Sequence, residues 1–205
     1  MFGNTNKIIT VTGCLGFLGI NLTKKLLNLG HRVIGIDSIT YVSNKNELLN
    51  LSSNINFKFI HSDINDLKFL HDTDIIIHTA ASSHVSNSIL DGSDFIHSNI
   101  NGSYNLLELI KNYRSDKKPK LIWLSTDEVY GDIAEGSHNE CSPLKPSNMY
   151  SATKASADML LLACGRTYNL DYNIIRPTNM YGISQYPEKL IPKTIKFLSL
   201  GRHIP

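Results

Sequence analysis

The sequence predicts an α/β fold, a Rossmann-type doubly wound parallel sheet with helices on both faces. Short runs rich in Ile and Val alternate with longer segments whose apolar residues recur every three or four positions. A glycine-rich turn at residues 13–19 joins the first run to the first long segment, and an acid ends the second run. Strands that alternate with helices in this way form a parallel sheet that is covered on both faces.

Six runs are expected to be strands because they are short, rich in β-branched residues and bounded by turn residues. In chain order they are Lys7–Thr12, Val33–Asp37, Asn56–Ile60, Asp74–His78, Lys120–Ser125 and Tyr172–Arg176.

Three longer segments are expected to be helices. In Gly16–Leu29, four leucines recur at helical spacing, and Gly30 follows as a suitable stop. Ser93–Tyr113 and Tyr150–Tyr168 carry broad apolar stripes. Their stripes either face the chain's own sheet or pair with a second copy of the chain.

The composition and the lack of several sequence patterns argue against some classes of function. The 205 residues carry a net charge of +2 without a Lys/Arg block, which argues against a nucleic-acid partner. No apolar run approaches the ~18 residues of a membrane span, and the N-terminus lacks the pattern of a secretory signal. Three cysteines at unrelated spacings predict no disulfide framework, and eight histidines show no metal-ligand spacing. We therefore expect a cytoplasmic location and no metal site.

The glycine turn predicts a dinucleotide site. Gly13, Gly16 and Gly19 follow a predicted strand and open a predicted helix, where glycines let the backbone approach a pyrophosphate. Asp37 lies roughly 20 residues on, at the end of the next strand, where a carboxylate accepts hydrogen bonds from ribose hydroxyls and repels a 2′-phosphate. This pattern favours NAD over NADP. The alternative is a glycine turn used for packing only.

Tyr150 and Lys154 stand four residues apart at the start of a predicted helix, which puts them on one face. A nearby ammonium, together with the positive nicotinamide ring of a bound cofactor, favours the phenolate, so this pair predicts a tyrosine of lowered pKa that acts as a general base on an alcohol. The alternative is a solvated pair on the helix surface.

The segment Ser125–Gly131 (STDEVYG) follows the fifth predicted strand, at the sheet edge where parallel sheets bind ligands. Thr126 can hydrogen-bond a reacting hydroxyl beside Tyr150. Asp127 and Glu128 form an adjacent acid pair, and elimination of water needs both a base and an acid. The alternative is a polar loop cap.

With these motifs, the chain resembles the extended short-chain dehydrogenase/reductases, and within them the nucleoside-diphosphate-glucose 4,6-dehydratases that act on dTDP-glucose or UDP-glucose. The resemblance spans nearly the whole chain. It is carried by TGCLGFLGINL, HTAASSHVSNSI, STDEVYG, YSATKASAD and NMYGISQYPEKLIPK, of which STDEVYG and YPEKLIPK are the most specific. The motifs do not separate dTDP-glucose from UDP-glucose.

The resemblance implies a role for each matching residue. It implies NAD as the cofactor, bound by Gly13, Gly16, Phe17, Leu18, Gly19, Asp37, Asp63, Ile64, Ala80, Ala81, Tyr150 and Lys154. It implies catalytic roles for Asn99, Thr126, Asp127, Glu128, Tyr150 and Lys154. A nucleoside-diphosphate sugar would be bound by Ser83, Asn179, Glu188, Lys189 and Leu190.

The resemblance also implies a reaction and an assembly. The sugar would be oxidised at C4, lose water across C5 and C6, and be reduced at C6. A homodimer is implied through the helices 93–113 and 150–168.

Family members extend beyond the length of this chain. We therefore expect a NAD-binding domain at 1–176 that holds the catalytic residues, and at 177–205 the incomplete beginning of a substrate-binding portion. Two alternatives stay open: a catalytically silent NAD-binding protein, and a nucleotide-sugar epimerase or decarboxylase. The acid pair argues against the second alternative.

Overall fold

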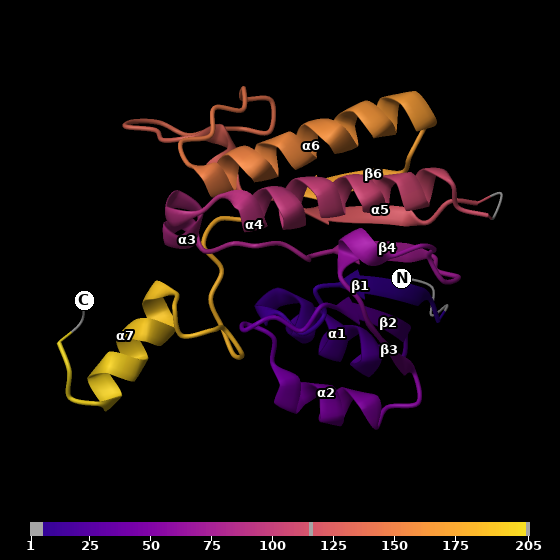
Figure 1. Cartoon of the computed structure of the whole chain (residues 1–205), viewed down its shortest axis with the longest axis horizontal. Helices are drawn as coiled ribbons and strands as arrows, with labels where there is room; N and C mark the ends of the chain where they lie inside the picture. Colours follow the sequence, from indigo (N-terminus) through magenta and orange to yellow (C-terminus); the bar gives the residue numbers. More distant parts are fainter. Residues whose placement is uncertain (1–5, 115–116, 204–205) are drawn as a thin grey trace.

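The computed structural model describes residues 6–114 and 117–203, and its centre is one six-stranded sheet (Figure 1). The strands are β1 (Ile8–Thr12), β2 (Arg32–Asp37), β3 (Phe57–His61), β4 (Ile75–His78), β5 (Lys120–Leu124) and β6 (Tyr172–Ile175). They lie in the order β3-β2-β1-β4-β5-β6, and all neighbouring pairs are parallel. The strand order reverses between β1 and β4, and ligands of such sheets bind at the carboxyl edge of this point. The predicted doubly wound sheet is confirmed.

Helices connect the strands. They are α1 (Phe17–Asn28), α2 (Lys45–Ser52), α3 (Val85–Leu90), α4 (Ser93–Phe95), α5 (Gly102–Lys111), α6 (Met149–Tyr168) and α7 (Leu190–Ser199). Two short 3₁₀ turns, η1 (Ile64–Asp66) and η3 (Asp127–Tyr130), follow β3 and β5. The sequence analysis did not predict α2, α3 or α7. The first two are short and carry a single buried residue each, so their periodic signal is weak. Helix α7 has a clear apolar stripe, which the sequence analysis passed over.

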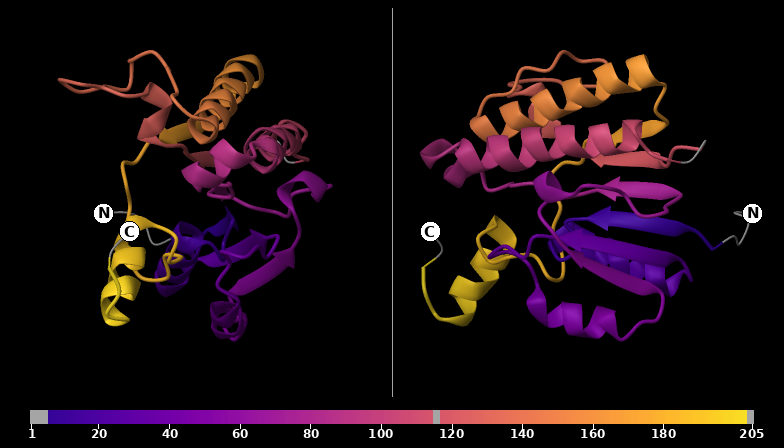
Figure 2. Two further views of the ribbon diagram at one scale, coloured as in Figure 1. Left: turned by 60° about the vertical axis from the view of Figure 1, so that its left-hand side comes forward. Right: turned by 45° about the vertical axis from the view of Figure 1, so that its right-hand side comes forward.

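Each face of the sheet has its own apolar core, and the two views of Figure 2 show helices on both sides. Successive side chains of a strand point to opposite faces. Thus Ile76 belongs to the cluster beneath α5 and α6, whereas Ile77 belongs to the cluster beneath α1 and α2. This burial on both sides explains the nearly continuous apolar strands in the sequence.

Helix α1 ends where the sequence predicts. Gly30 has a φ of +84°, and its N–H donates to the carbonyl of Leu27, while the N–H of His31 donates to the carbonyl of Leu26. This is the Schellman arrangement, in which a left-handed residue satisfies the last helical carbonyls.

The predicted helix Ser93–Tyr113 is not a continuous α-helix in the structure. The backbone is helical from Ser93 to Lys111, but Ile96–Asn101 (η2) is a π-helix between α4 and α5. Such wider turns occur mainly at functional sites because they re-aim a side chain. Here the π-helical stretch contains Asn99, which is buried.

Helix α7 stands apart from the sheet in Figure 1, and its large apolar residues Leu190, Ile195 and Leu198 are exposed.

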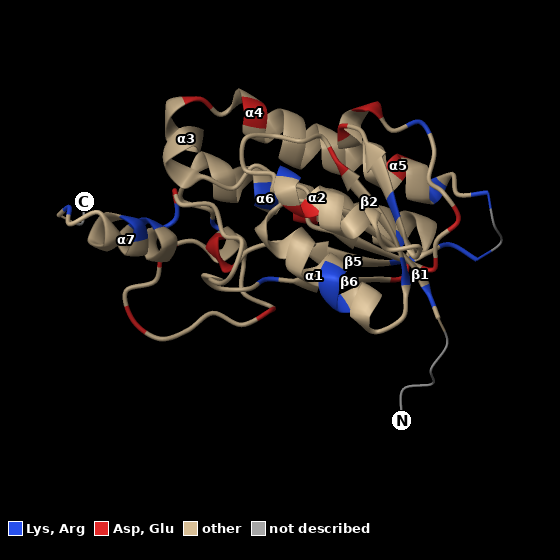
Figure 3. Ribbon diagram, turned by 90° about the horizontal axis from the view of Figure 1, so that it is seen from below, with Lys and Arg blue, Asp and Glu red and all other residues tan. Residues whose placement is uncertain are grey.

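Figure 3 shows acidic and basic residues interspersed among the elements in that view. Among the described residues, no helix has the length and hydropathy that a membrane crossing requires. No group of His, Cys, Asp and Glu in the described part of the chain could hold a metal ion.

Candidate active site

A cavity of about 610 Å³ opens at the carboxyl edge of β1, β2 and β4. Its wall brings together residues that are far apart in the sequence but share this edge of the sheet. Eight residues that the sequence analysis assigned to cofactor or substrate line it: Gly13, Gly16, Asp37, Asp63, Ile64, Ala80, Ala81 and Ser83. A ninth such residue, Glu188 from the C-terminal segment, also lines it.

The glycine turn fits the diphosphate of a dinucleotide. A Cβ on Gly13, whose φ is +67°, would lie 2.8 Å from the backbone of Ala80. A Cβ on Gly19 would collide with the carbonyl of Gly13. Gly16 caps α1 without a side-chain hydrogen bond, and the first turn of α1 holds no acid. The N–H groups at this helix end are therefore free to bind an anion, and the helix dipole favours one.

Next to this turn, Asp37 organises the wall of the cavity. It is 7% exposed, and its carboxylate accepts hydrogen bonds from the N–H of Leu15 (2.9 Å), the N–H of Ile39 (2.8 Å) and the hydroxyl of Ser43 (2.9 Å). A single carboxylate thus connects the glycine turn with the loop after β2.

Phe17 and Leu18 begin α1 and are half-buried. Further along the cavity, Asp63 caps η1 by accepting a 2.8 Å hydrogen bond from the N–H of Asn65. Ile64 is buried against Gly102, where a Cβ would collide with its side chain.

Asn99 supports the loop after β4. Its side-chain carbonyl accepts a 2.9 Å hydrogen bond from the N–H of Ser82, and its amide donates to the carbonyl of Ser82 (3.0 Å) and the hydroxyl of Thr153 (2.9 Å). Asn99 therefore connects the loop under the cavity with α6, and all these bonds go to other protein groups.

The acid pair lies on η3, directly after β5. Thr126 caps this turn by accepting a hydrogen bond from the N–H of Glu128, and its hydroxyl donates to Asp127 at 3.2 Å. The carboxylate of Glu128 accepts a 3.1 Å hydrogen bond from the side-chain amide of Asn148. Asn148 also caps α6, and the sequence analysis missed it.

The charges of the acid pair act on the phenol of Tyr150. The pKa of Tyr150 is raised to about 12, first by burial and then by the negative charges of Glu128 and Asp127, while a hydrogen bond with Thr126 lowers it. The protein groups alone therefore raise this pKa, through burial and the two carboxylates. The predicted lowering, which includes the positive charge of a nicotinamide ring, stays a prediction.

Lys154 lies one turn further along α6 and is 4% exposed. Its ammonium donates a 2.6 Å hydrogen bond to the carbonyl of Leu124 at the end of β5. Burial lowers the pKa of Lys154 to about 8, against the opposing effect of the Asp158 carboxylate.

Beneath Lys154 lies His78, a fully buried histidine at the end of β4. Its ring is hydrogen-bonded to Thr12 (2.8 Å) and Ser103 (3.4 Å), and its centroid lies 4.5 Å from that of Trp123. Burial and the charge of Lys154 lower the pKa of His78 to about 3, so its ring is neutral near pH 7.

The C-terminal segment reaches back to the cavity. The hydroxyl of Tyr41 donates a 3.0 Å hydrogen bond to Glu188, and the ammonium of Lys189 donates a 2.7 Å hydrogen bond to the carbonyl of Ser83. Asn179 and Leu190 are exposed and are not among the residues that line the cavity.

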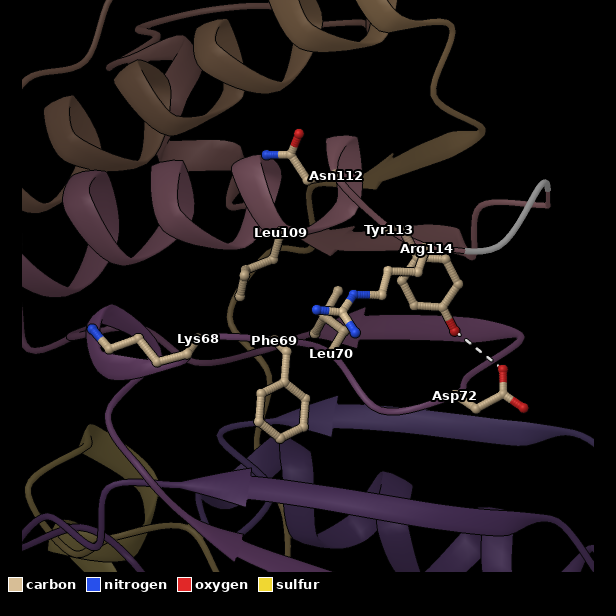
Figure 4. A pocket seen from close by; sticks show the side chains of 8 residues that line it. All are labelled: Lys68, Phe69, Leu70, Asp72, Leu109, Asn112, Tyr113 and Arg114. Atoms are coloured by element: carbon tan, nitrogen blue, oxygen red, sulfur yellow. Dashed lines mark hydrogen bonds between the residues drawn. The ribbon is translucent and has the colours of Figure 1, made fainter.

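A second cavity, of about 830 Å³, lies between residues 68–72 and the end of α5 (Figure 4). Tyr113 in its wall is hydrogen-bonded to Asp72 at 3.3 Å. None of the residues predicted to bind cofactor or substrate lines it, and its greater volume does not make it the candidate active site.

Comparisons with known proteins identify the family of this chain. The family model described as "NAD dependent epimerase/dehydratase family" matches residues 9–205. A dTDP-glucose 4,6-dehydratase of Haemophilus influenzae is 40% identical over 96% of this chain and 63% of its own length.

Two solved structures are also similar. The dTDP-glucose 4,6-dehydratase of Streptomyces venezuelae, solved with NAD bound, has a TM-score of 0.89 and 38% identity over 95% of this chain and 62% of its own. The UDP-glucuronic acid 4-epimerase of Bacillus cereus has a TM-score of 0.89 and 30% identity over 96% and 64%. This chain therefore spans about three fifths of the length of these relatives. On these matches, the chain belongs to the NAD dependent epimerase/dehydratase family, whose cofactor is NAD.

Proposed function

We propose that this chain carries the cofactor site and the acid–base residues of a nucleoside-diphosphate-glucose 4,6-dehydratase. The observation that carries the proposal is the proximity of two carboxylates to one phenol. Glu128 and Asp127 both act on the charge state of Tyr150. Oxidation of an alcohol alone needs only the phenol and its supports, whereas elimination of water also needs a base and an acid.

The cofactor would lie along the 610 Å³ cavity. The glycine turn and the start of α1 (Gly13, Gly16, Phe17, Leu18 and Gly19) would bind its diphosphate, and Asp37 the adenosine ribose. Asp63, Ile64, Ala80 and Ala81 would form the remaining wall. When bound, NAD supplies the acceptor and later the donor of a hydride, and its positive ring favours the anionic form of a neighbouring phenol.

The residues of this chain would move protons at three positions of the sugar: the 4-hydroxyl, C5 and the 6-hydroxyl. Tyr150 takes the proton of the sugar's 4-hydroxyl, assisted by Thr126 and by the charge of Lys154. The resulting C4 ketone acidifies C5, so Glu128 removes the C5 proton, and Asp127 gives a proton to the 6-hydroxyl, which leaves as water. After reduction at C6, a proton returns to C5. Asn99 would hold the loop beneath the reacting groups.

The nucleoside-diphosphate sugar would approach from the side of Ser83, Glu188 and Lys189, with Asn179 and Leu190 at the outer edge. We propose residues 1–176 as the NAD-binding domain and 177–205 as the beginning of a substrate-binding portion. Residues of the second segment already reach the cavity through Glu188 and Lys189.

Exposed apolar side chains on α5 and α6 support a homodimer. Tyr104 on α5 is 53% exposed, and Met159 on α6 is 57% exposed. Light scattering of the purified chain tests this part of the proposal: a mass of one chain at micromolar concentration would contradict it.

Mass spectrometry of products tests the proposed reaction. The chain is incubated with NAD and either UDP-glucose or dTDP-glucose, and the loss of one water identifies both the reaction and the nucleotide. An epimerised product of unchanged mass would favour the epimerase alternative. NAD binding with no turnover of either sugar would favour the silent NAD-binding protein. Asp127→Asn with full water loss would contradict the acid role of Asp127.

A further inference from the structure

A buried ion pair lies behind the acid pair. Asp158, on the inner face of α6, is 0% exposed, and its carboxylate accepts three hydrogen bonds. The donors are the indole of Trp123 (3.1 Å), the hydroxyl of Ser125 (2.9 Å) and the Nε group of Arg176 (2.9 Å). The Nη2 group of Arg176 completes the ion pair, 2.9 Å from the carboxylate. A buried charge persists only when its hydrogen-bonding capacity is satisfied, and this carboxylate is satisfied.

Arg176 extends this network to a third element. It follows β6 directly, and its remaining terminal nitrogen, Nη1, donates a 2.8 Å hydrogen bond to the hydroxyl of Tyr130. The guanidinium carbon also lies 5.1 Å from the centroid of the Tyr130 ring. The planar fork of Arg176 therefore joins α6 to η3, which a flexible ammonium could not do with the same geometry.

The network holds both ends of the turn that carries the acid pair. Ser125 immediately precedes Thr126, the N-cap of η3, and Tyr130 is the last residue of η3. Both are bonded to one ion pair: Ser125 to Asp158, and Tyr130 to Arg176. Asp127 and Glu128 lie between these two points.

We propose that the Asp158–Arg176 ion pair is a positioning element that holds Asp127 and Glu128 against Tyr150. This inference rests on the proposed function for its effect on catalysis. The ion pair does not touch the reacting atoms, so it acts through the acid pair. Its loss reduces the elimination of water more than the oxidation at C4, because both carboxyl groups of the elimination lie on η3. Tyr150 and Lys154, on which the oxidation depends first, lie on α6, and only Thr126, the N-cap of η3, assists them.

The choice of variants follows from the network. Asp158 also favours the charged form of Lys154, so a change of Asp158 would disturb two functions at once. Arg176→Lys keeps the positive charge but removes the fork, and Tyr130→Phe removes only the far hydrogen bond. Asp171→Asn is the matched control, because Asp171 forms an exposed ion pair with Lys120 between the other ends of β5 and β6 (3.4 Å).

Hydrogen–deuterium exchange of the full chain tests the positioning without any need for activity. Amide exchange in residues 125–131 should become about tenfold faster in Arg176→Lys and severalfold faster in Tyr130→Phe, and should not change in Asp171→Asn. Unchanged exchange in Arg176→Lys overturns the inference. A uniform increase over the whole sheet also overturns it, since it would show a general structural role.

The catalytic arm compares two partial reactions in a single turnover with NAD and the sugar nucleotide that the wild-type chain accepts. Water loss in Arg176→Lys should fall about ten- to a hundredfold, as expected for a lost hydrogen bond to a charged group, with reduction of the cofactor changed less than threefold. An equal loss of both partial reactions overturns the inference. A wild-type chain that performs neither reaction contradicts the proposed function instead, and the exchange experiment alone then decides the positioning.

Discussion

The side-chain amide of Asn148 donates a 3.1 Å hydrogen bond to the carboxylate of Glu128, while its carbonyl accepts one from the N–H of Ser151 at 2.8 Å. One side chain therefore begins helix α6 and holds one member of the acid pair. Because α6 also carries Tyr150 and Lys154, the start of this helix fixes the base, its cation and the carboxylate relative to one another.

Asn148→Ala and Asn148→Asp separate these two tasks. Alanine removes both and should lower the free energy of unfolding by about 1 kcal/mol, as for other lost helix caps. Aspartate keeps the cap, so the free energy of unfolding should change by less than about 0.5 kcal/mol. It also replaces the amide donor beside Glu128 with a negative charge. Both variants should reduce water elimination at least about tenfold. Urea unfolding and product mass spectrometry measure the two effects, and full elimination by Asn148→Asp would contradict the role of the amide.

Burial of Lys154 predicts a specific dependence of stability on pH. Its pKa falls from 10.5 to about 8 on folding, so between these values the unfolded chain binds more protons than the folded chain. The free energy of unfolding contributed by this group therefore rises with pH across this window, by at most about 1.4 kcal/mol per pH unit.

Lys154→Met removes this contribution. Urea unfolding of the wild type and the variant at pH 7 to 10 should give a difference that changes with pH, because contributions from other groups cancel between the two chains. Parallel curves would show that the pKa of Lys154 is not lowered. The variant should also lose oxidation of the sugar, since the charge beside Tyr150 is gone.

The lowered pKa of His78 predicts that the folded chain loses stability in acid. Its pKa falls from 6.5 to about 3 on folding, so the unfolded chain binds a proton in this range and the folded chain does not. The free energy of unfolding should therefore decrease as the pH falls below 6.5, by at most about 1.4 kcal/mol per unit. His78→Gln should flatten this decrease, whereas His203→Gln, a change at an exposed position, should not. Denaturant titrations at pH 7, 6 and 5 make the comparison.

The bond between Tyr41 and Glu188 joins the loop after β2 to the C-terminal segment at the cavity wall. Burial, together with the bonded Glu188, raises the pKa of Tyr41 to about 12, so its hydroxyl stays a donor at neutral pH. Tyr41→Phe should speed NAD dissociation about two- to tenfold, the range of one neutral hydrogen bond. Tyr186→Phe is the control, since it retains the edge-to-face contact with the ring of Tyr41. Stopped-flow displacement measures both rates, and equal rates in Tyr41→Phe and the wild type would rule out a retaining role.

Much of the fold follows from local patterns. The six predicted strands agree with β1 to β6 within one residue at each end, because strands buried on both faces appear as apolar runs bounded by turn residues. The short helix α2 escaped prediction because only Leu51 on it is buried. The π-helical turn at Asn99 has no signature in the apolar spacing of its segment.

The sequence by itself determined the sheet, the glycine turn and the types of residue at its carboxyl edge, because each depends on neighbours in the chain. The tertiary structure alone decided the electrostatics. Burial beside Glu128 and Asp127 raises the pKa of Tyr150, an effect that the spacing of Tyr150 and Lys154 does not indicate. It also decided that Asp158 pairs with Arg176, 18 residues further along. Desolvation and contacts between distant segments arise only when the sheet and helices assemble, so no local pattern encodes them.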